Sequence, residues 1–157
     1  MEVWIFINPF LRTLLYFSCF AAVGANLFLF HFRNLLSVQS VFYCENLTSR
    51  SSLLGIIVSL ATFFSIPGTL GGEFFSAFDT TLLVFTFETK IGWSTFFCFI
   101  GFLFLLAVSY SPNGLRLLLA FSGSVVVLGS FILVGHSTQK GLLVQGVLAA
   151  HLVGISF

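Results

Sequence analysis

Long apolar runs are the feature of this sequence that most restricts its fold. Only 7% of the 157 residues are charged and 58% are hydrophobic, so polar residues merely separate one apolar run from the next. A soluble domain carries about a quarter charged residues, whereas a helix that crosses a bilayer needs about 20 predominantly apolar residues in succession. The sequence therefore predicts an integral membrane protein made of helices.

The runs predict an all-α membrane bundle with four complete transmembrane helices and a truncated fifth, in a single membrane domain over residues 1–157. We expect spans at Pro9–Phe30, Leu53–Leu70, Ile91–Ser109, Leu115–Gly135 and Leu142–Phe157. Asn8 and Pro9 are typical of a helix start, with Asn8 as the N-cap. Pro67 and Gly68 should kink or end the second span. The fifth run would extend only about 22 Å, less than a hydrocarbon core of about 30 Å.

Two of the connections between the predicted spans are long. Residues 31–52 are polar and predict a loop with room for a short interfacial helix. Residues 73–90 carry acidic groups at intervals but are otherwise apolar. This pattern predicts an interfacial helix or re-entrant turn rather than a disordered loop.

The charges near the span ends bear on sidedness. Lys and Arg are divided equally between the two sides of the predicted bundle, whereas Glu45 is the only acid on the side of the first and third loops. This uneven distribution of acids favours an external N-terminus, although acids count for little in the positive-inside rule. The first loop, between the first and second spans, and the third loop, between the third and fourth spans, would then be cytoplasmic. The formal charge of +1 and the lack of a basic patch argue against nucleic acid as a partner.

The sequence contains no motif typical of hydrolytic enzymes. A nucleophile elbow, a phosphate loop and an HExxH pair are all missing, so we expect no enzyme. Cys19, Cys44 and Cys98 are far apart and odd in number, which predicts neither a disulfide framework nor a zinc site. Cys19 and Cys98 lie inside apolar runs and should be small core residues.

Histidines are the candidate ligands. His151 lies about 14 Å along the fifth predicted helix, close to mid-membrane. It is either a metal or haem ligand or a structural histidine bonded across helices. His136 follows the fourth span, where an imidazole also suits a helix C-terminus. We expect His151 to face the bundle interior and His136 to cap the fourth span. The two histidines would then bind a metal ion in succession along one path, rather than serve as two ligands of one ion.

The order of these features resembles one family. The stretches "LRTLLYFSCFAAVGANLF", "FTFETKIGWSTFF", "LVGHST" and "VLAAHLVGISF" are similar to the N-terminal half of the bacterial copper resistance protein D (CopD) family. The Gly-His at the end of one span and the Ala-His-Leu in the next carry most of this resemblance. By position it implies that His136 and His151 are the metal-binding residues, with Arg12 a structural match.

The resemblance implies a multi-pass protein of the bacterial inner membrane that handles copper ions, in transport or resistance through copper import. A periplasmic copper-binding protein would be its partner besides the lipid bilayer, together with an oligomer or a complementary helical half. Two other functions remain open. One is a b-type haem protein for electron transfer, and the other is a non-catalytic membrane subunit or truncated remnant with structural histidines.

Overall fold

The computed structural model describes residues 2–134 and 142–156. These residues form helices and no strand, which confirms the predicted all-α class. In chain order, with η for a 3-10 helix, the elements are α1 (Glu2–Phe32), η1 (Arg33–Leu35), α2 (Val38–Gly71), η2 (Phe75–Phe78), α3 (Thr80–Glu88), α4 (Lys90–Ala107), η3 (Val108–Tyr110), α5 (Asn113–Val134) and α6 (Leu142–Ser156).

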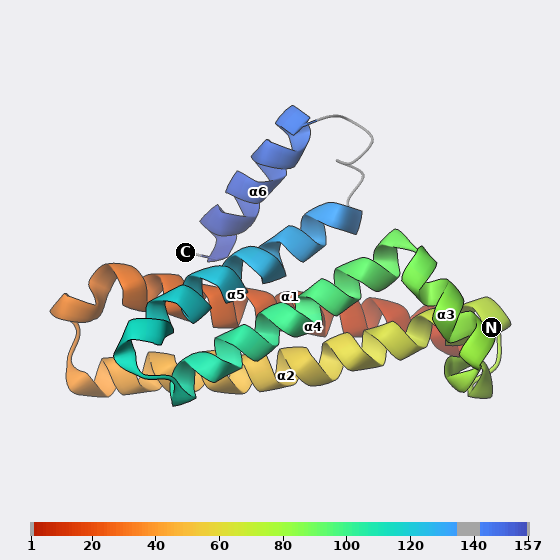
Figure 1. Ribbon diagram of the computed structural model, residues 1–157, viewed down its shortest axis with the longest axis horizontal. Helices are drawn as coiled ribbons and strands as arrows, with labels where there is room; N and C mark the ends of the chain where they lie inside the picture. Colours follow the sequence, from red (N-terminus) through yellow and green to blue (C-terminus); the bar gives the residue numbers. More distant parts are fainter. Residues whose placement is uncertain (1, 135–141, 157) are drawn as a thin grey trace.

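The long helices lie side by side in an elongated bundle (Figure 1). Helix α1 packs against α2, α4 packs against α5, and α2 joins the two pairs through its contacts with α4. The short helix α6 contacts α1 and α5 on one flank. Helix α3 and the N-terminus of α1 lie at the same end of the bundle, where α2 finishes (Figure 1).

Four helices of the described chain are long and apolar enough to cross a membrane. They are Val3–Leu35, Val38–Gly71, Lys90–Tyr110 and Gly114–Val134. The last two have 21 residues each, which extend about 32 Å and match a hydrocarbon core of about 30 Å. A shorter apolar helix at Gly146–Ile155 corresponds to the predicted partial fifth span. The predicted architecture of four spans and a short fifth helix is thereby confirmed.

The outer surface of the bundle is strongly apolar. Phe17 is 64% exposed and Phe121 is 70% exposed, and both belong to helices of spanning length. Such large side chains are unfavourable in water but stable against lipid tails, and the backbone polar groups of a helix are satisfied within the helix itself. The surface therefore fits a lipid bilayer.

The predicted start of the first helix is wrong. Helix α1 begins at Glu2, and Pro9 lies inside it. Packing explains the earlier start: Trp4 is only 6% exposed, sits against Gly68 of α2 and stacks on Phe74 at 6.1 Å between ring centroids. These contacts hold the first turns in helical form although Pro9 cannot donate a backbone hydrogen bond.

The predicted loop over residues 31–52 is also wrong. Helix α2 already begins at Val38, because the Ser37 side chain accepts a hydrogen bond from the backbone N–H of Ser40 at 3.2 Å and caps the first turn. The helix then continues past Pro67 and ends at Gly71. Gly72 closes it in the left-handed conformation with φ of 76°, which glycine adopts without strain.

Residues 73–90 are mostly helical, so the predicted short helix is present, whereas its place at the membrane interface stays a prediction. This segment contains η2 and α3, and the carboxylate of Asp79 caps α3 by accepting hydrogen bonds from the backbone N–H groups of Thr81 at 2.8 Å and Leu82 at 3.3 Å. Thr89 then caps α4 by accepting from the N–H of Gly92 at 3.0 Å. Two successive N-caps therefore turn the chain from α3 into α4.

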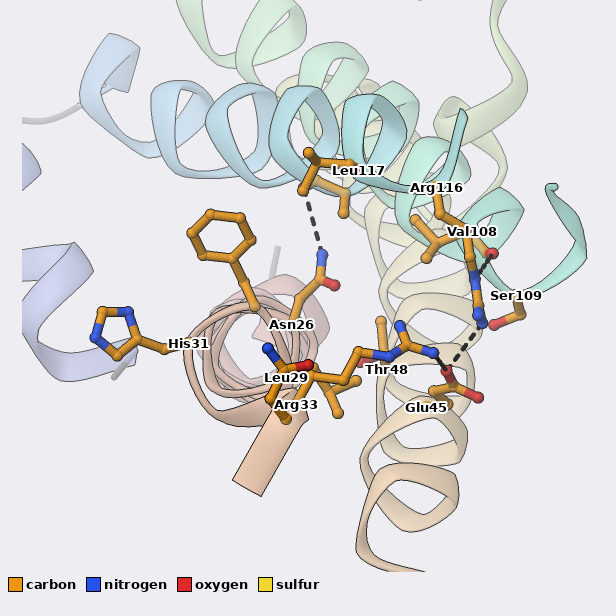
Figure 2. A pocket seen from close by; sticks show the side chains of 13 residues that line it. Asn26, Leu29, His31, Arg33, Glu45, Thr48, Val108, Ser109, Arg116 and Leu117 are labelled. Atoms are coloured by element: carbon orange, nitrogen blue, oxygen red, sulfur yellow. Dashed lines mark hydrogen bonds and ion pairs between the residues drawn. The ribbon is translucent and has the colours of Figure 1, made fainter. Parts of the chain in front are cut away.

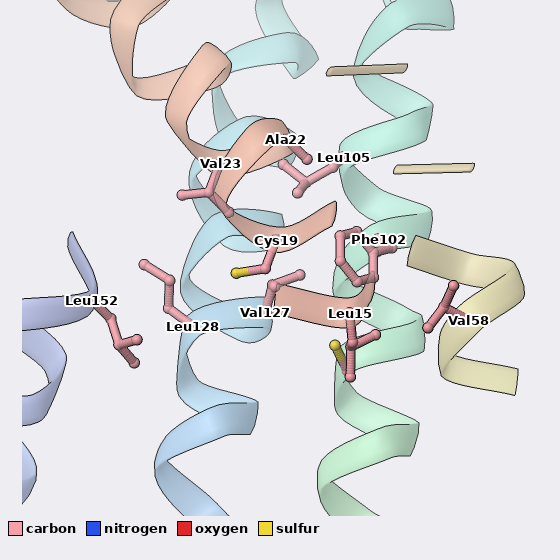
Figure 3. Close-up of a cluster of buried hydrophobic side chains, with 11 residues drawn as sticks. Leu15, Cys19, Ala22, Val23, Val58, Phe102, Leu105, Val127, Leu128 and Leu152 are labelled. Carbon is pink, nitrogen blue, oxygen red and sulfur yellow. The ribbon is translucent and has the colours of Figure 1, made fainter. Parts of the chain in front are cut away.

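The core lies where α1, α2, α4, α5 and α6 meet (Figure 3). Phe102 is fully buried, and its ring occupies the space beside Gly55, where a Cβ atom would lie 2.5 Å from the ring. The buried cluster comprises Leu15, Cys19, Ala22, Val23, Val58, Cys98, Phe102, Leu105, Val127, Leu128 and Leu152. It confirms the prediction that Cys19 and Cys98 are core residues.

Candidate functional site

A cavity of about 430 Å³ opens at the end of the bundle where α1 finishes and α5 begins (Figure 2). Residues from α1, η1, α2, η3 and α5 form its walls. They are Asn26, Leu29, Phe30, His31, Arg33, Asn34, Glu45, Thr48, Val108, Ser109, Arg116, Leu117 and Ala120. Charged and apolar side chains therefore both line the cavity, and no single helix forms it.

Three charged side chains meet in this cavity. The Nη2 atoms of Arg33 and Arg116 both donate to the same carboxylate oxygen, Oε1 of Glu45, at 3.3 Å and 3.0 Å (Figure 2). The Arg33 side chain is 52% exposed, whereas those of Arg116 and Glu45 are 21% and 28% exposed. Two guanidinium groups against one carboxylate leave this cluster with one excess positive charge.

Further hydrogen bonds hold together the helices that surround the cluster. The Nε of Arg116 donates to the carbonyl oxygen of Val108 at 3.2 Å, which ties α5 to η3. The side-chain amide of Asn26 donates to the carbonyl oxygen of Ala120 at 3.3 Å, which ties α1 to α5. The cavity is thus held by contacts between helices that are remote in the sequence.

The sequence did not predict this cluster. Arg33 and Arg116 entered only as charges near span ends, and Glu45 only as the one acid on that side. The available signal was that all three residues were predicted on the same side of the membrane. Which of them touch depends on the packing of α4 against both α2 and α5, which no sequence pattern specifies.

The predicted inward orientation of His151 is wrong. His151 is exposed on α6, whereas its neighbour Leu152 is 6% exposed and belongs to the buried core. Successive residues of a helix point about 100° apart, so burying the apolar leucine turns the imidazole away from the bundle. His136 lies outside the described residues, and whether either histidine binds metal remains a prediction.

The other ionisable candidates do not converge on a metal site. His31, Arg12 and Glu73 are all exposed. Within residues 2–134 and 142–156, no group of three or more His, Cys, Asp or Glu side chains could hold a metal ion. The soft donors of the core are the free thiols of Cys19 and Cys98, which are 0% and 1% exposed.

These features define a multi-pass helical membrane protein with an ion-paired cavity at one end of its bundle. Residues 1–146 match the model of the copper resistance protein D-like N-terminal domain. The chain belongs to this family and is a copper-related membrane protein, as the resemblance implied. No curated protein and no solved structure matches the chain.

Proposed function

We propose that this protein moves copper ions across the bacterial inner membrane, as a transporter and not an enzyme. The observation that supports this function most is the family match over residues 1–146, in a chain with four helices able to span a membrane. Copper is the substrate, and import is the direction that the family resemblance implies. A periplasmic copper-binding protein is the partner that we expect to deliver the ion.

In this proposal, His136 and His151 provide imidazole ligands, which suit copper. The exposed position of His151 on α6 leaves its imidazole accessible to a copper ion from outside the described bundle. Cys19 and Cys98 add soft sulfur donors inside the bundle, which suit Cu(I). His151 would thus receive or release the ion at the flank of the bundle.

The test is copper uptake by cells that express the full chain, with expression checked by immunoblot. We expect His151→Ala to abolish most of the uptake and His136→Ala to reduce it. His31→Ala is the control for the loss of an exposed histidine, because His31 lies in the last turn of α1 and is neither of the two proposed ligands. Uptake that stays at the wild-type level in both ligand variants would refute the histidine assignment.

The purified chain distinguishes copper handling from haem binding. We expect it to retain copper in a stoichiometric amount and to show no Soret band. A Soret band that disappears in His151→Ala would contradict the copper proposal and would support a b-type haem protein. Absence of both copper and haem would leave the histidines with a structural role only.

A further inference from the structure

We propose that the cavity formed around Arg33, Glu45 and Arg116 binds the phosphate group of an anionic membrane lipid. This inference is independent of copper transport, because it concerns a different part of the fold. It follows from three observations: the depth of the cavity relative to the spans, the donors that its two arginines leave unused, and the apolar walls beside them.

The cavity lies at the level where lipid headgroups are expected. The first and third spanning helices end beside it, at Leu35 and Tyr110, and the fourth begins beside it at Gly114. The third and fourth spanning helices have 21 residues each, which matches the hydrocarbon core, so we expect groups beside their ends to lie at the level of the phosphates of one leaflet. Arginine at this level attracts anionic lipids, with a contribution of about 1 kcal/mol per residue.

The two arginines have unused hydrogen-bond donors. A guanidinium group carries five N–H bonds and matches a phosphate in a bidentate way. Within the described chain, Arg33 makes a hydrogen bond only to Glu45, and Arg116 bonds only to Glu45 and Val108. Because Glu45 offers one negative charge to two positive groups, the cluster keeps one positive charge that a second anion can balance.

The walls of the cavity favour a lipid over a free anion. Phe30 and Leu117 line it and are 68% and 57% exposed, so they also belong to the apolar outer surface. An acyl chain can lie along these side chains while its phosphate reaches the arginines. Inorganic phosphate would leave the same apolar wall uncovered, and the volume of about 430 Å³ falls in the range of small-molecule sites.

The first test measures lipid binding by native mass spectrometry of the delipidated full chain in detergent. The probes are dioleoyl-phosphatidylglycerol, which is anionic, and dioleoyl-phosphatidylcholine, which is zwitterionic. We expect preferential binding of the anionic lipid, and Arg33→Gln should weaken that binding about fivefold. Arg50→Gln is the matched control, because Arg50 is exposed on α2 and does not line the cavity.

The second test removes the acidic member of the cluster, Glu45. Glu45→Gln removes the carboxylate that competes for the arginines, so phosphatidylglycerol should bind more tightly, by several-fold. If the three charges serve only to join helices, this variant would bind the lipid no better than the wild type. An increase in Glu45→Gln with a decrease in Arg33→Gln is therefore the pattern that supports the site.

The remaining outcomes contradict the proposal. Equal effects of Arg33→Gln and Arg50→Gln would mean that only the overall charge matters. Equal binding of the two lipids would contradict a lipid site. If millimolar inorganic phosphate then also raised the melting temperature of the protein, the site would be assigned to a free anion. Arg33 is the residue chosen for replacement because its exposed side chain makes a folding defect less of a risk than at Arg116.

Discussion

The carboxylate of Glu45 lies 3.0 Å from the guanidinium group of Arg116, although 71 positions separate the two residues. This ion pair joins the beginning of α2 to the beginning of α5, and both side chains are largely shielded from solvent. Arg33 approaches the same carboxylate oxygen from η1 at 3.3 Å. One acidic side chain thus connects three segments at one end of the bundle.

This arrangement predicts unequal effects of removing the two arginines. Arg116→Gln should destabilise the protein by about 1–3 kcal/mol, because it breaks a partly buried ion pair and a hydrogen bond to Val108. Arg33→Gln should cost less than about 1 kcal/mol, since that pair is more exposed. Thermal unfolding in detergent measures both, and equal melting temperatures for the two variants would contradict the prediction.

Close packing of α4 against α5 makes Gly101 intolerant of substitution. A Cβ atom there would lie 2.5 Å from Cγ2 of Val127 and 2.8 Å from its backbone nitrogen. Gly101→Ala should therefore force the two helices apart and cost about 1–3 kcal/mol. Gly129→Ala is the matched control, because nothing lies within 4 Å of a Cβ atom at Gly129 and alanine favours a helix. A melting temperature lowered to the same extent in both variants would refute this packing.

The three cysteines should differ in reactivity. Cys19 and Cys98 are buried at 0% and 1% exposure, whereas Cys44 is partly exposed on α2. We expect N-ethylmaleimide to label one thiol per folded chain and three after denaturation, because the reagent needs an accessible thiolate. Cys44→Ser should abolish labelling of the folded protein. Rapid labelling of that variant would show that the core around Cys19 and Cys98 opens.

The N-cap of α3 predicts a local effect on stability. Asp79→Ala removes the carboxylate that accepts from the N–H groups of Thr81 and Leu82, which should destabilise this helix by about 1 kcal/mol. Hydrogen exchange over residues 80–88 should then be about fivefold faster. Asp79→Asn, which keeps an oxygen acceptor, should exchange nearly like the wild type. Exchange that is unchanged in Asp79→Ala would mean that other contacts hold α3.

The helix ends show where sequence-based prediction failed. Asn8 and Pro9 have the pattern of a helix start, but α1 begins at Glu2 because Trp4 packs against Gly68. That contact joins residues 64 positions apart, so no local signal could indicate it. The Ser37 cap was a local signal, but the polar composition of residues 31–52 favoured a loop instead.

The sequence by itself determined the class of protein, the spanning helices and the family, because apolar runs of this length and the histidine motifs are local properties of the chain. Only the tertiary structure decided that His151 turns outward and that Glu45 meets Arg33 and Arg116. Those outcomes depend on how the helices rotate and pack. The burial of Leu152 turns α6 so that the adjacent imidazole faces outward, and the contacts of α4 with α2 and with α5 bring together charges that lie far apart along the chain.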